Sequence, residues 1–280
     1  MTRTTIQGRL TQERAAFGVQ GADVADAIFA DGESPLKHGS DIDVTRTVFE
    51  WKYPLWFTKD VTLNDSAFLD TARSGPWYAD NMTLRHVLVA APKTFRRSRR
   101  LVFDDVQFAD AAETLWDCDD IRMTHVMARG DYFGMNSSNV VADDLALTGN
   151  YAFDGGHDIV IDHSTLLSKD AFWNCRDVVV RNSIVIGEYL GWNSTNLTFE
   201  NCLIESLQGL CYIDNLVLRG CRLINTTLAF EYSTVDAEII GSIDSVINPK
   251  AGVIKADHID DLILDPDRVD VDATVIEVLP

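Results

Sequence analysis

A short unit recurs along the chain at a nearly constant interval, and this repeat constrains the fold more than any other feature. Each unit usually has Asp or Asn, an apolar residue, any residue and a second apolar residue. The leading apolar residues, here called anchors, are Val24, Ile42, Val61, Met82, Leu101, Ile121, Val140, Ile159, Val178, Leu197, Leu216 and Val235. Successive anchors are 18, 19, 21, 19, 20, 19, 19, 19, 19, 19 and 19 residues apart. A fixed period of this size predicts a solenoid, in which each repeat buries its apolar face against its neighbours.

The pattern inside a repeat indicates which solenoid it is. Apolar residues alternate in segments 177–185 and 196–204, and no helical pattern fits the remaining positions. We therefore expect an all-β, single-stranded right-handed parallel β-helix with about 12 coils of ~19 residues, each with three short strands. A leucine-rich repeat is the alternative, because segment 216–223 matches its consensus, but the asparagine position of that consensus holds Ser or Cys here.

The fourth and the fifth residue after each anchor have recognisable roles. The fourth residue is short and polar, which is typical of a bend that needs left-handed backbone: Asp65, His86, Asp105, His125, Asp144, His163, Asn182, Asn201 and Gly220. The histidines raise the question of a metal site, but alternate coils would hold them about 9.6 Å apart, so we expect no metal. The fifth residue is small or apolar and should point inward: Ser66, Val87, Val106, Val126, Leu145, Ser164, Ser183, Cys202 and Cys221.

Cysteine use and the N-terminal sequence bear on the compartment. The 5 cysteines occur without a C-x-x-C spacing, which favours buried, reduced thiols in a reducing compartment. Residues 1–8 have no apolar core of the secretory type, and no run of residues is long enough to cross a bilayer. We expect a cytoplasmic protein with a single β-helix domain, 1–280, in which 1–20 and 245–280 cap the coils of 21–244.

Charge is distributed unevenly along the chain. Residues 1–100 have 14 Lys and Arg against 12 Asp and Glu, a net +2, whereas residues 101–280 have 10 against 31, a net −21. So acidic a protein is a poor partner for nucleic acid or an anionic membrane. The exception is segment 93–100, with five cations, which is either a solvated loop or an anion site.

The segment before each anchor holds two unusual rows of side chains. Five residues before the anchors stand Trp56, Trp77, Arg96, Trp116, Met135, Asp154, Trp173 and Trp192. Eight or nine residues before them stand Glu33, Lys52, Arg73, Lys93, Glu113, Asp131, Lys169, Asp170 and Glu188. The tryptophans have two open interpretations, an exposed ladder or an internal aromatic stack. The charged row should lie at the surface, because unpaired charges are almost never buried.

If both rows face outward, they form a groove suited to a glycan, with indoles for sugar faces and charged groups for hydroxyls. The candidate acid/base residues, on the model of paired carboxylates in glycoside cleavage, are Glu113, Asp131, Asp154, Asp170 and Glu188. The candidate ligand-binding residues for an anionic sugar are Lys93, Arg96, Arg97, Trp116, Lys169, Trp173 and Trp192. We expect no cofactor.

Several longer motifs also resemble a known family. They are GESPLKH at 32–38, EWKYPLW at 50–56, APKTFRR at 91–97, ETLW at 113–116, GDYF at 130–133, KDAFWNC at 169–175, GEYLGWNS at 187–194, LQGLCYIDN at 207–215 and LAFEYSTVDAEI at 228–239. The chain is similar in these motifs to the bacterial family catalogued as domain of unknown function 3737. The resemblance covers nearly the whole chain and implies a right-handed parallel β-helix of one domain. It implies no activity and no catalytic residues.

Two functions from different classes remain open. The first is a carbohydrate-binding or carbohydrate-processing protein, in the latter case a hydrolase or lyase of an anionic glycan or oligosaccharide. The alternative is a non-catalytic scaffold for protein–protein interaction or self-assembly. Whether the protein is an enzyme, which sugar it binds and its oligomeric state do not follow from the sequence.

Overall fold

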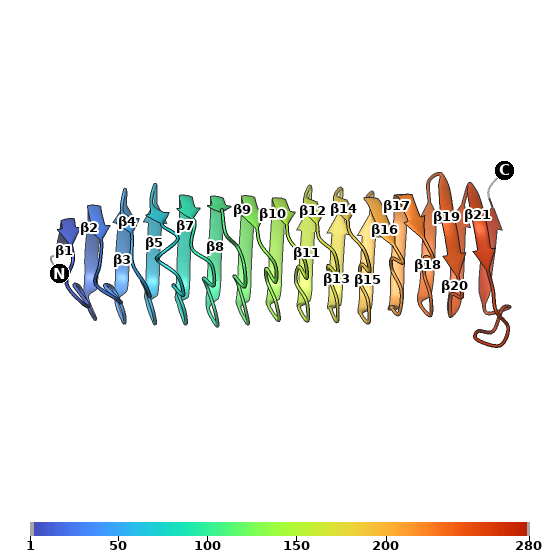
Figure 1. The fold of residues 1–280 in the computed structure, drawn as a ribbon, viewed down its shortest axis with the longest axis horizontal. Helices are drawn as coiled ribbons and strands as arrows, with labels where there is room; N and C mark the ends of the chain where they lie inside the picture. The colour runs from blue at the N-terminus through green and yellow to red at the C-terminus, as the bar shows by residue number, and fades with distance from the viewer. Residues whose placement is uncertain (1–2, 279–280) are drawn as a thin grey trace. The chain divides into compact units, whose positions relative to one another are not determined.

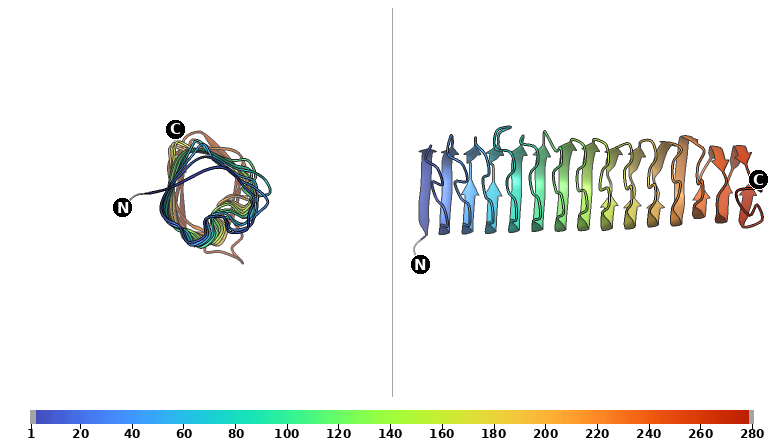
Figure 2. Two further views of the ribbon diagram at one scale, coloured as in Figure 1. Left: turned by 90° about the vertical axis from the view of Figure 1, so that its left-hand side faces the viewer. Right: turned by 60° about the horizontal axis from the view of Figure 1, so that its bottom comes forward.

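The computed structural model describes residues 3–278 and is a parallel β-solenoid of about 14 turns, spaced about 19 residues apart (Figure 1). The predicted parallel β-helix is thereby confirmed. Contacts divide the chain into two compact units, Met1–Ala146 and Leu147–Pro280, here called unit 1 and unit 2. Seen end-on, the coils of each unit lie over one another (Figure 2). The described residues contain no helix long and apolar enough to cross a membrane.

The strands of unit 1 run parallel, each paired with the equivalent strand of the next coil. They are β1 (Thr4–Leu10), β2 (Gln20–Phe29), β3 (Ser40–Thr45), β4 (Val48–Phe49), β5 (Lys59–Asn64), β6 (Ala67–Phe68), β7 (Asp80–Val89), β8 (Arg99–Phe108) and β9 (Asp119–Arg129). β10 (Ser138–Thr148) contains the boundary between the units.

Unit 2 repeats the same arrangement, with two strands separated by a bend in most coils. The strands are β11 (His157–Asp162), β12 (Thr165–Leu167), β13 (Arg176–Arg181), β14 (Ile184–Ile186), β15 (Thr195–Glu200), β16 (Leu203–Leu207), β17 (Asp214–Thr227), β18 (Thr234–Ile239), β19 (Ser242–Ile247), β20 (Ala251–Ala256), β21 (His258–Ile263) and β22 (Thr274–Val278). The third segment of each coil is a series of turns, where a third strand was expected.

The register of the anchors agrees with the repeat, with one correction. In unit 1, Ile42, Val61, Met82, Leu101 and Ile121 pair in succession, and in unit 2, Ile159, Val178, Leu197, Leu216 and Val235 do the same. The first anchor was misplaced, because Ile42 pairs with Ala22 and not with Val24. Ala22 and Val24 are both buried on the same face, so alternation alone cannot separate them.

The pairing of strands also extends beyond the predicted coils, which explains why there are about 14 turns and not about 12. β1 pairs with β2 inside the segment expected to be an N-terminal cap. β20 pairs with β18 and β22 pairs with β20 inside the segment expected to be a C-terminal cap. Their sequences lack the D/N-apolar unit, so the repeat did not reveal them.

One coil of unit 1 is two residues longer than most, and the extra residues lie in its turn segment. Phe49 pairs with Phe68, an offset of 19, whereas Lys59 pairs with Asp80, an offset of 21. By the next coil Trp77 bridges Arg96, and the offset has returned to 19. The insertion is therefore confined to the stretch between Phe68 and Trp77, and the strands on either side keep their register.

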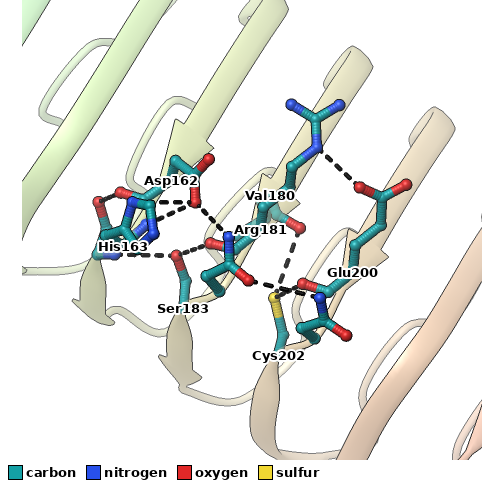
Figure 3. Close-up of polar contacts among 10 residues, drawn as sticks. Asp162, His163, Val180, Arg181, Ser183, Glu200 and Cys202 are labelled. Atoms are coloured by element: carbon teal, nitrogen blue, oxygen red, sulfur yellow. Dashed lines mark hydrogen bonds and ion pairs between the residues drawn. The ribbon is translucent and has the colours of Figure 1, made fainter.

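The predicted bends are confirmed by the backbone. All nine residues four after an anchor, from Asp65 to Gly220, have φ between 46° and 61°, the left-handed region. Asp, Asn and Gly tolerate this region best, and the side chains of Asn and Asp also link adjacent coils. Asn182 Nδ2 donates to Asp162 Oδ1 at 2.8 Å, and Figure 3 shows Asp162 and His163 at this bend with Ser183 beside them. The Asp and Asn directly before the anchors also have positive φ, 56° at Asp177 and 57° at Asn196, so backbone conformation explains the Asp and Asn of the repeat as well.

The core consists of rows of side chains, each row formed by the equivalent positions of successive coils. All nine side chains five after an anchor are at most 6% exposed, as predicted. Seven after the anchor, Phe49 stacks on Phe29 and Phe68 at 5.3 and 4.7 Å between centroids in unit 1, whereas the equivalent row of unit 2 has Leu166, Val185 and Ile204. All five cysteines are buried and free.

Candidate functional site

The turn segments place some side chains in the core and others on the outer surface. In the coil that precedes Ile121, Glu113, Leu115 and Asp117 all have φ near 55°, between 53° and 57°. Leu115 is fully buried, whereas Trp116 is half-buried beside it. The same order, a buried residue six before the anchor and a half-buried one five before it, recurs before other anchors, so the residues five before an anchor form a row on the outer surface.

The tryptophans of this row are at the surface but cover one another. Trp56, Trp77, Trp116, Trp173 and Trp192 are all half-buried. The core positions beside them are filled by other residues, Leu55, Phe95, Leu115 and Phe172 among them, each fully buried. The internal aromatic stack is therefore wrong for the indoles, and the exposed ladder holds in part.

In unit 1 the ladder consists of two stacked indoles, a guanidinium and a third indole. Trp56 and Trp77 stack at 5.2 Å between centroids with an interplanar angle of 11°. Arg96 lies between Trp77 and Trp116, with Cζ 5.2 and 4.6 Å from their ring centroids. A guanidinium sandwiched in this way keeps its charge at the surface and gains cation–π attraction from both rings.

Glu113 fixes this guanidinium from the side. Its Oε2 accepts from Arg96 Nη2, and its Oε1 is 3.3 Å from Lys93 Nζ. Partial burial alone would raise the pKa of Glu113, but the hydrogen bonds from Arg96 and Lys93 outweigh it and hold the pKa below its usual value. Glu113 is therefore an ionised carboxylate with two cationic partners, which makes it a poor proton donor at neutral pH.

A pocket of about 270 Å³ opens on this ladder and is lined by Trp77, Tyr78, Arg96, Arg97, Trp116 and Asp117. Arg97 is the most accessible of its cations, with 64% of its side chain exposed. Its Nη1 donates to Tyr78 Oη at 3.4 Å, and its Nε lies 3.7 Å from Asp117. The pocket, here called the unit 1 pocket, joins aromatic faces to two guanidinium groups.

Arg96, Arg97 and Trp116 of this lining were predicted as ligand-binding residues, whereas Trp77, Tyr78 and Asp117 were not. Tyr78, Arg97 and Asp117 are each four residues before an anchor, a row that also includes Phe57. The ring of Tyr78 stacks on Phe57 at 4.6 Å with an interplanar angle of 2°. The available signal was the succession His38, Phe57, Tyr78 at this one position, which forms a second aromatic ladder beside the tryptophans.

In unit 2 one expected surface residue is buried. Asp170 is 1% exposed, which corrects the prediction that the charged row lies at the surface. Its Oδ1 has no hydrogen-bond partner among the described residues. Burial raises its pKa, Lys169 and a hydrogen bond with Tyr151 lower it, and Glu188 and Asp154 raise it again, with a net upward shift. Aromatic residues in the turn segments allow such burial, because Tyr151 is one coil before Asp170 and Tyr189 one coil after it.

Among the other predicted residues of unit 2, Lys169, Glu188 and Asp154 act electrostatically on this carboxyl. Lys169 Nζ lies 3.1 Å from Glu188 and 5.2 Å from the ring centroid of Tyr189. Asn174 Nδ2 donates to Asp154 Oδ1 at 3.2 Å. Trp173 and Trp192 are 6.4 Å apart between centroids with an interplanar angle of 49°.

The predicted site residues therefore separate into two groups. Unit 1 brings together Lys93, Arg96, Arg97, Glu113 and Trp116, and Asp131 is exposed in the next coil, where its carbonyl accepts from Glu113 N at 2.9 Å. Unit 2 holds the remaining predicted residues, Asp154, Lys169, Asp170, Trp173, Glu188 and Trp192. Only in unit 1 do several of them line one pocket among the described cavities.

The arrangement of possible metal ligands and the pKa values of the thiols bear on two further kinds of chemistry. Within residues 3–278, no group of three or more His, Cys, Asp or Glu side chains is placed to hold a metal ion. Burial raises the pKa of the Cys118 and Cys211 thiols to about 12 and that of Cys175 still further. A thiol with so high a pKa is a weak nucleophile at neutral pH.

Comparison with known proteins gives the family. No curated protein matches the sequence. Among solved structures, the chain is similar to the A-module of a mannuronan C-5 epimerase of Azotobacter vinelandii, with 10% identity, a TM-score of 0.30, and 98% of this chain and 87% of that chain covered. It is also similar to PfbA, a surface adhesin of Streptococcus pneumoniae, with 11% identity, a TM-score of 0.32, and 94% and 73% covered.

The family model for proteins of unknown function DUF3737 matches residues 3–277. This match spans almost every coil described above, including both ladders and the unit 1 pocket. The family suggested by the motifs is thereby confirmed, and the chain belongs to DUF3737, a family of proteins of unknown function.

Proposed function

We propose that this protein binds an anionic glycan, and that the unit 1 pocket holds one sugar of it. The observation that carries the proposal is the lining, in which Trp77, Tyr78 and Trp116 stand beside Arg96 and Arg97. The exposed parts of the rings offer apolar surface to a sugar, although Trp56 and Arg96 cover the faces of Trp77, and a guanidinium recognises a carboxylate through paired hydrogen bonds. The two requirements of a uronic acid thus meet in one place.

The size and charge of the pocket support a single sugar. Its volume of about 270 Å³ lies just below the range of roughly 300–1,000 Å³ that is usual for ligand pockets. The lining has two cations, Arg96 and Arg97, and one carboxylate, Asp117, so its net charge is positive. Arg97 is held by long contacts of 3.4 and 3.7 Å, so a ligand carboxylate can compete for its donors.

The state of the carboxyl groups favours binding of the glycan without catalytic turnover. Glu113 is ionised and paired, and Asp170, whose raised pKa would suit a general acid, is almost completely buried. The catalytic roles of Glu113, Asp131, Asp154, Asp170 and Glu188 stay a prediction. An oligouronate whose chain length falls on incubation with the protein, and no longer falls with Asp170→Asn, would support the hydrolase or lyase.

Titration calorimetry with oligouronates tests the binding proposal. Arg97→Ala should weaken binding by at least tenfold, about 1.4 kcal/mol, because the most accessible guanidinium is lost. Arg122→Ala is the matched control, since it removes the same charge from an exposed side chain of unit 1 outside the pocket and should change affinity by less than twofold. Equal affinities for the two variants, or no binding by the parent, would overturn the proposal.

The scaffold alternative has one observation in its favour. Leu167, Ile184 and Ile224 are apolar yet 42%, 39% and 40% exposed, on the outer face of strands β12, β14 and β17. The occupant that this surface suits is a second copy of the chain, because rows with the same coil spacing can interdigitate. Gel filtration at increasing concentration should then show a dimer that Ile184→Glu dissociates. A protein that remains monomeric at high concentration contradicts self-assembly.

A further inference from the structure

Unit 2 contains a second pocket, larger than the first, that none of the predicted site residues lines. Its volume is about 590 Å³, and its lining is Asn193, Tyr212, Asp214, Tyr232, Lys250, Arg268, Val269 and Asp270. These residues come from successive coils of unit 2 and from the segment between β21 and β22. The pocket is here called the unit 2 pocket.

An aromatic ladder leads into this pocket. Trp173 and Trp192 are followed by Tyr212 and Tyr232, with centroid separations of 6.4, 4.4 and 5.3 Å between neighbours. The interplanar angles are 49°, 33° and 53°, unlike the 11° between Trp56 and Trp77 in unit 1. Tilted rings cover each other incompletely, so part of a ring face stays open, and Tyr212 is 39% exposed.

The opposite wall is a loop that is held in place. Asn248, 2% exposed, accepts a hydrogen bond from Asp265 N at 2.8 Å through its side-chain oxygen. Arg268 N donates to Asp265 O at 2.9 Å, and Arg268 Nε lies 3.3 Å from the Asp265 carboxylate. A hydrogen bond with Tyr232 raises the pKa of Arg268, which ties the loop to the aromatic ladder. The wall therefore exists before any ligand arrives.

The charges of the lining balance. Lys250 and Arg268 are matched by Asp214 and Asp270, and Lys250 Nζ is 3.3 Å from Asp214. The unit 1 pocket, by contrast, has two cations and one carboxylate. A balanced lining gives an anionic ligand no net attraction, whereas its mixture of donors and acceptors suits the hydroxyl pairs of an uncharged sugar.

We infer that the unit 2 pocket is a binding site for a neutral sugar, which rests a ring face on Tyr212 and Tyr232. Asn193, Asp214 and Lys250 supply hydrogen bonds to its hydroxyls. Burial is the main cause that raises the pKa of Tyr212, followed by Glu231 and Tyr232, so the phenol keeps its proton and acts as a donor at neutral pH. This site does not depend on the glycan proposed for unit 1.

The test is titration calorimetry with two panels, neutral oligosaccharides of glucose, mannose and xylose, and oligouronates. Tyr212→Ala should weaken binding of a neutral sugar by at least tenfold, because the loss of one ring removes the platform. Tyr78→Ala is the matched control: it truncates a half-buried tyrosine of the unit 1 pocket and should leave neutral-sugar affinity unchanged. Raising the salt from 0.05 to 0.5 M should change that affinity by less than twofold, since an uncharged ligand releases no ions.

Asp214→Ala provides a second variant that does not disturb the ladder, since the Asp214 side chain is 66% exposed, and should weaken neutral-sugar binding about fivefold. The inference is overturned if no neutral sugar binds, or if binding is the same in Tyr212→Ala, Asp214→Ala and the parent. It is also overturned if Tyr212→Ala weakens only the oligouronates. Binding of neutral sugars by a protein that ignores every oligouronate would uphold this site and overturn the proposal for unit 1.

Discussion

Glu113 in unit 1 and Asp170 in unit 2 occupy the same position of their coils, eight residues before Ile121 and Val178, yet their carboxyl groups behave in opposite ways. The pKa of Glu113 is lowered because hydrogen bonds from Arg96 and Lys93 outweigh its partial burial. The pKa of Asp170 is raised because burial outweighs Lys169 and Tyr151. In a solenoid, the residues one coil away decide the chemistry of a position as much as the residue itself.

The same contrast extends to the core. Phe49 stacks between two phenylalanines in unit 1, whereas Val185 occupies the equivalent place in unit 2. Phe49→Ala should lower the free energy of unfolding by about 3–5 kcal/mol, and Val185→Ala by about 2 kcal/mol, because the cavity left by a ring is larger. Chemical denaturation followed by circular dichroism measures both. Equal losses would contradict this expectation and mean that Phe49 stabilises the core no more than the smaller Val185 does.

A smaller effect is expected at Asp170. The folded-state pKa lies above the unfolded value of 3.8, so ionisation destabilises the fold at neutral pH and the penalty disappears as the pH falls toward 3.8. Asp170→Asn, which keeps the shape and removes the charge, should raise the free energy of unfolding at pH 7 by on the order of 1 kcal/mol. Denaturation at pH 7 and pH 4 should show this gain shrinking.

The exposed Asp261 on β21 offers a control for that substitution. Asp261→Asn also removes a single negative charge from unit 2 and should leave stability within about 0.5 kcal/mol of the parent. If Asp170→Asn is no more stable than Asp261→Asn, neighbouring groups offset the cost of burying the Asp170 carboxylate. The difference between Asp170 and Glu113 is then smaller than the burial of Asp170 indicates.

The smallest effect is expected at Glu113, with the opposite sign. Its folded-state pKa lies below the unfolded value of 4.5, so its stabilising contribution is present above pH 4.5 and is lost as the pH falls through the folded pKa. Glu113→Gln should lower the free energy of unfolding at pH 7 by roughly 0.5 kcal/mol, a modest figure because the pair is partly solvated. Denaturation at pH 7 and pH 4 measures this effect, and a Glu113→Gln variant more stable than the parent at pH 7 would contradict the prediction.

The fold could be predicted because its determinants are local. Alternation sets the faces of each strand, and Asp, Asn, His or Gly marks each left-handed bend, so the anchors from Ile42 to Ile121 and from Ile159 to Val235 were located correctly. Val24 was assigned in place of Ala22 because a shift of two residues keeps the same face inward. β20 and β22 were missed because their coils have lost the Asp and Asn of the repeat.

The site was less predictable because it depends on contacts between coils. The row five before the anchors revealed Trp116 and Arg96, but charge alone gave the wrong place for Asp170, whose burial depends on its surroundings in neighbouring coils. Tyr78 could have been found from the aromatic succession at its position, but Asp117, in the same row, follows Arg97 and continues no pattern of residue type. The unit 2 pocket also needs Arg268, in a loop after the last anchor, which no periodic pattern could place.

The longer coil between Val61 and Met82 has an evolutionary consequence. Its extra residues enter between Phe68 and Trp77, and the strands around them keep their pairing. Selection can therefore alter length and sequence in the turn segments while the strands remain constant, as framework and hypervariable loops do in antibodies. Relatives with the same coils are then free to diverge in specificity first at the turns, where Trp77 and its neighbours stand.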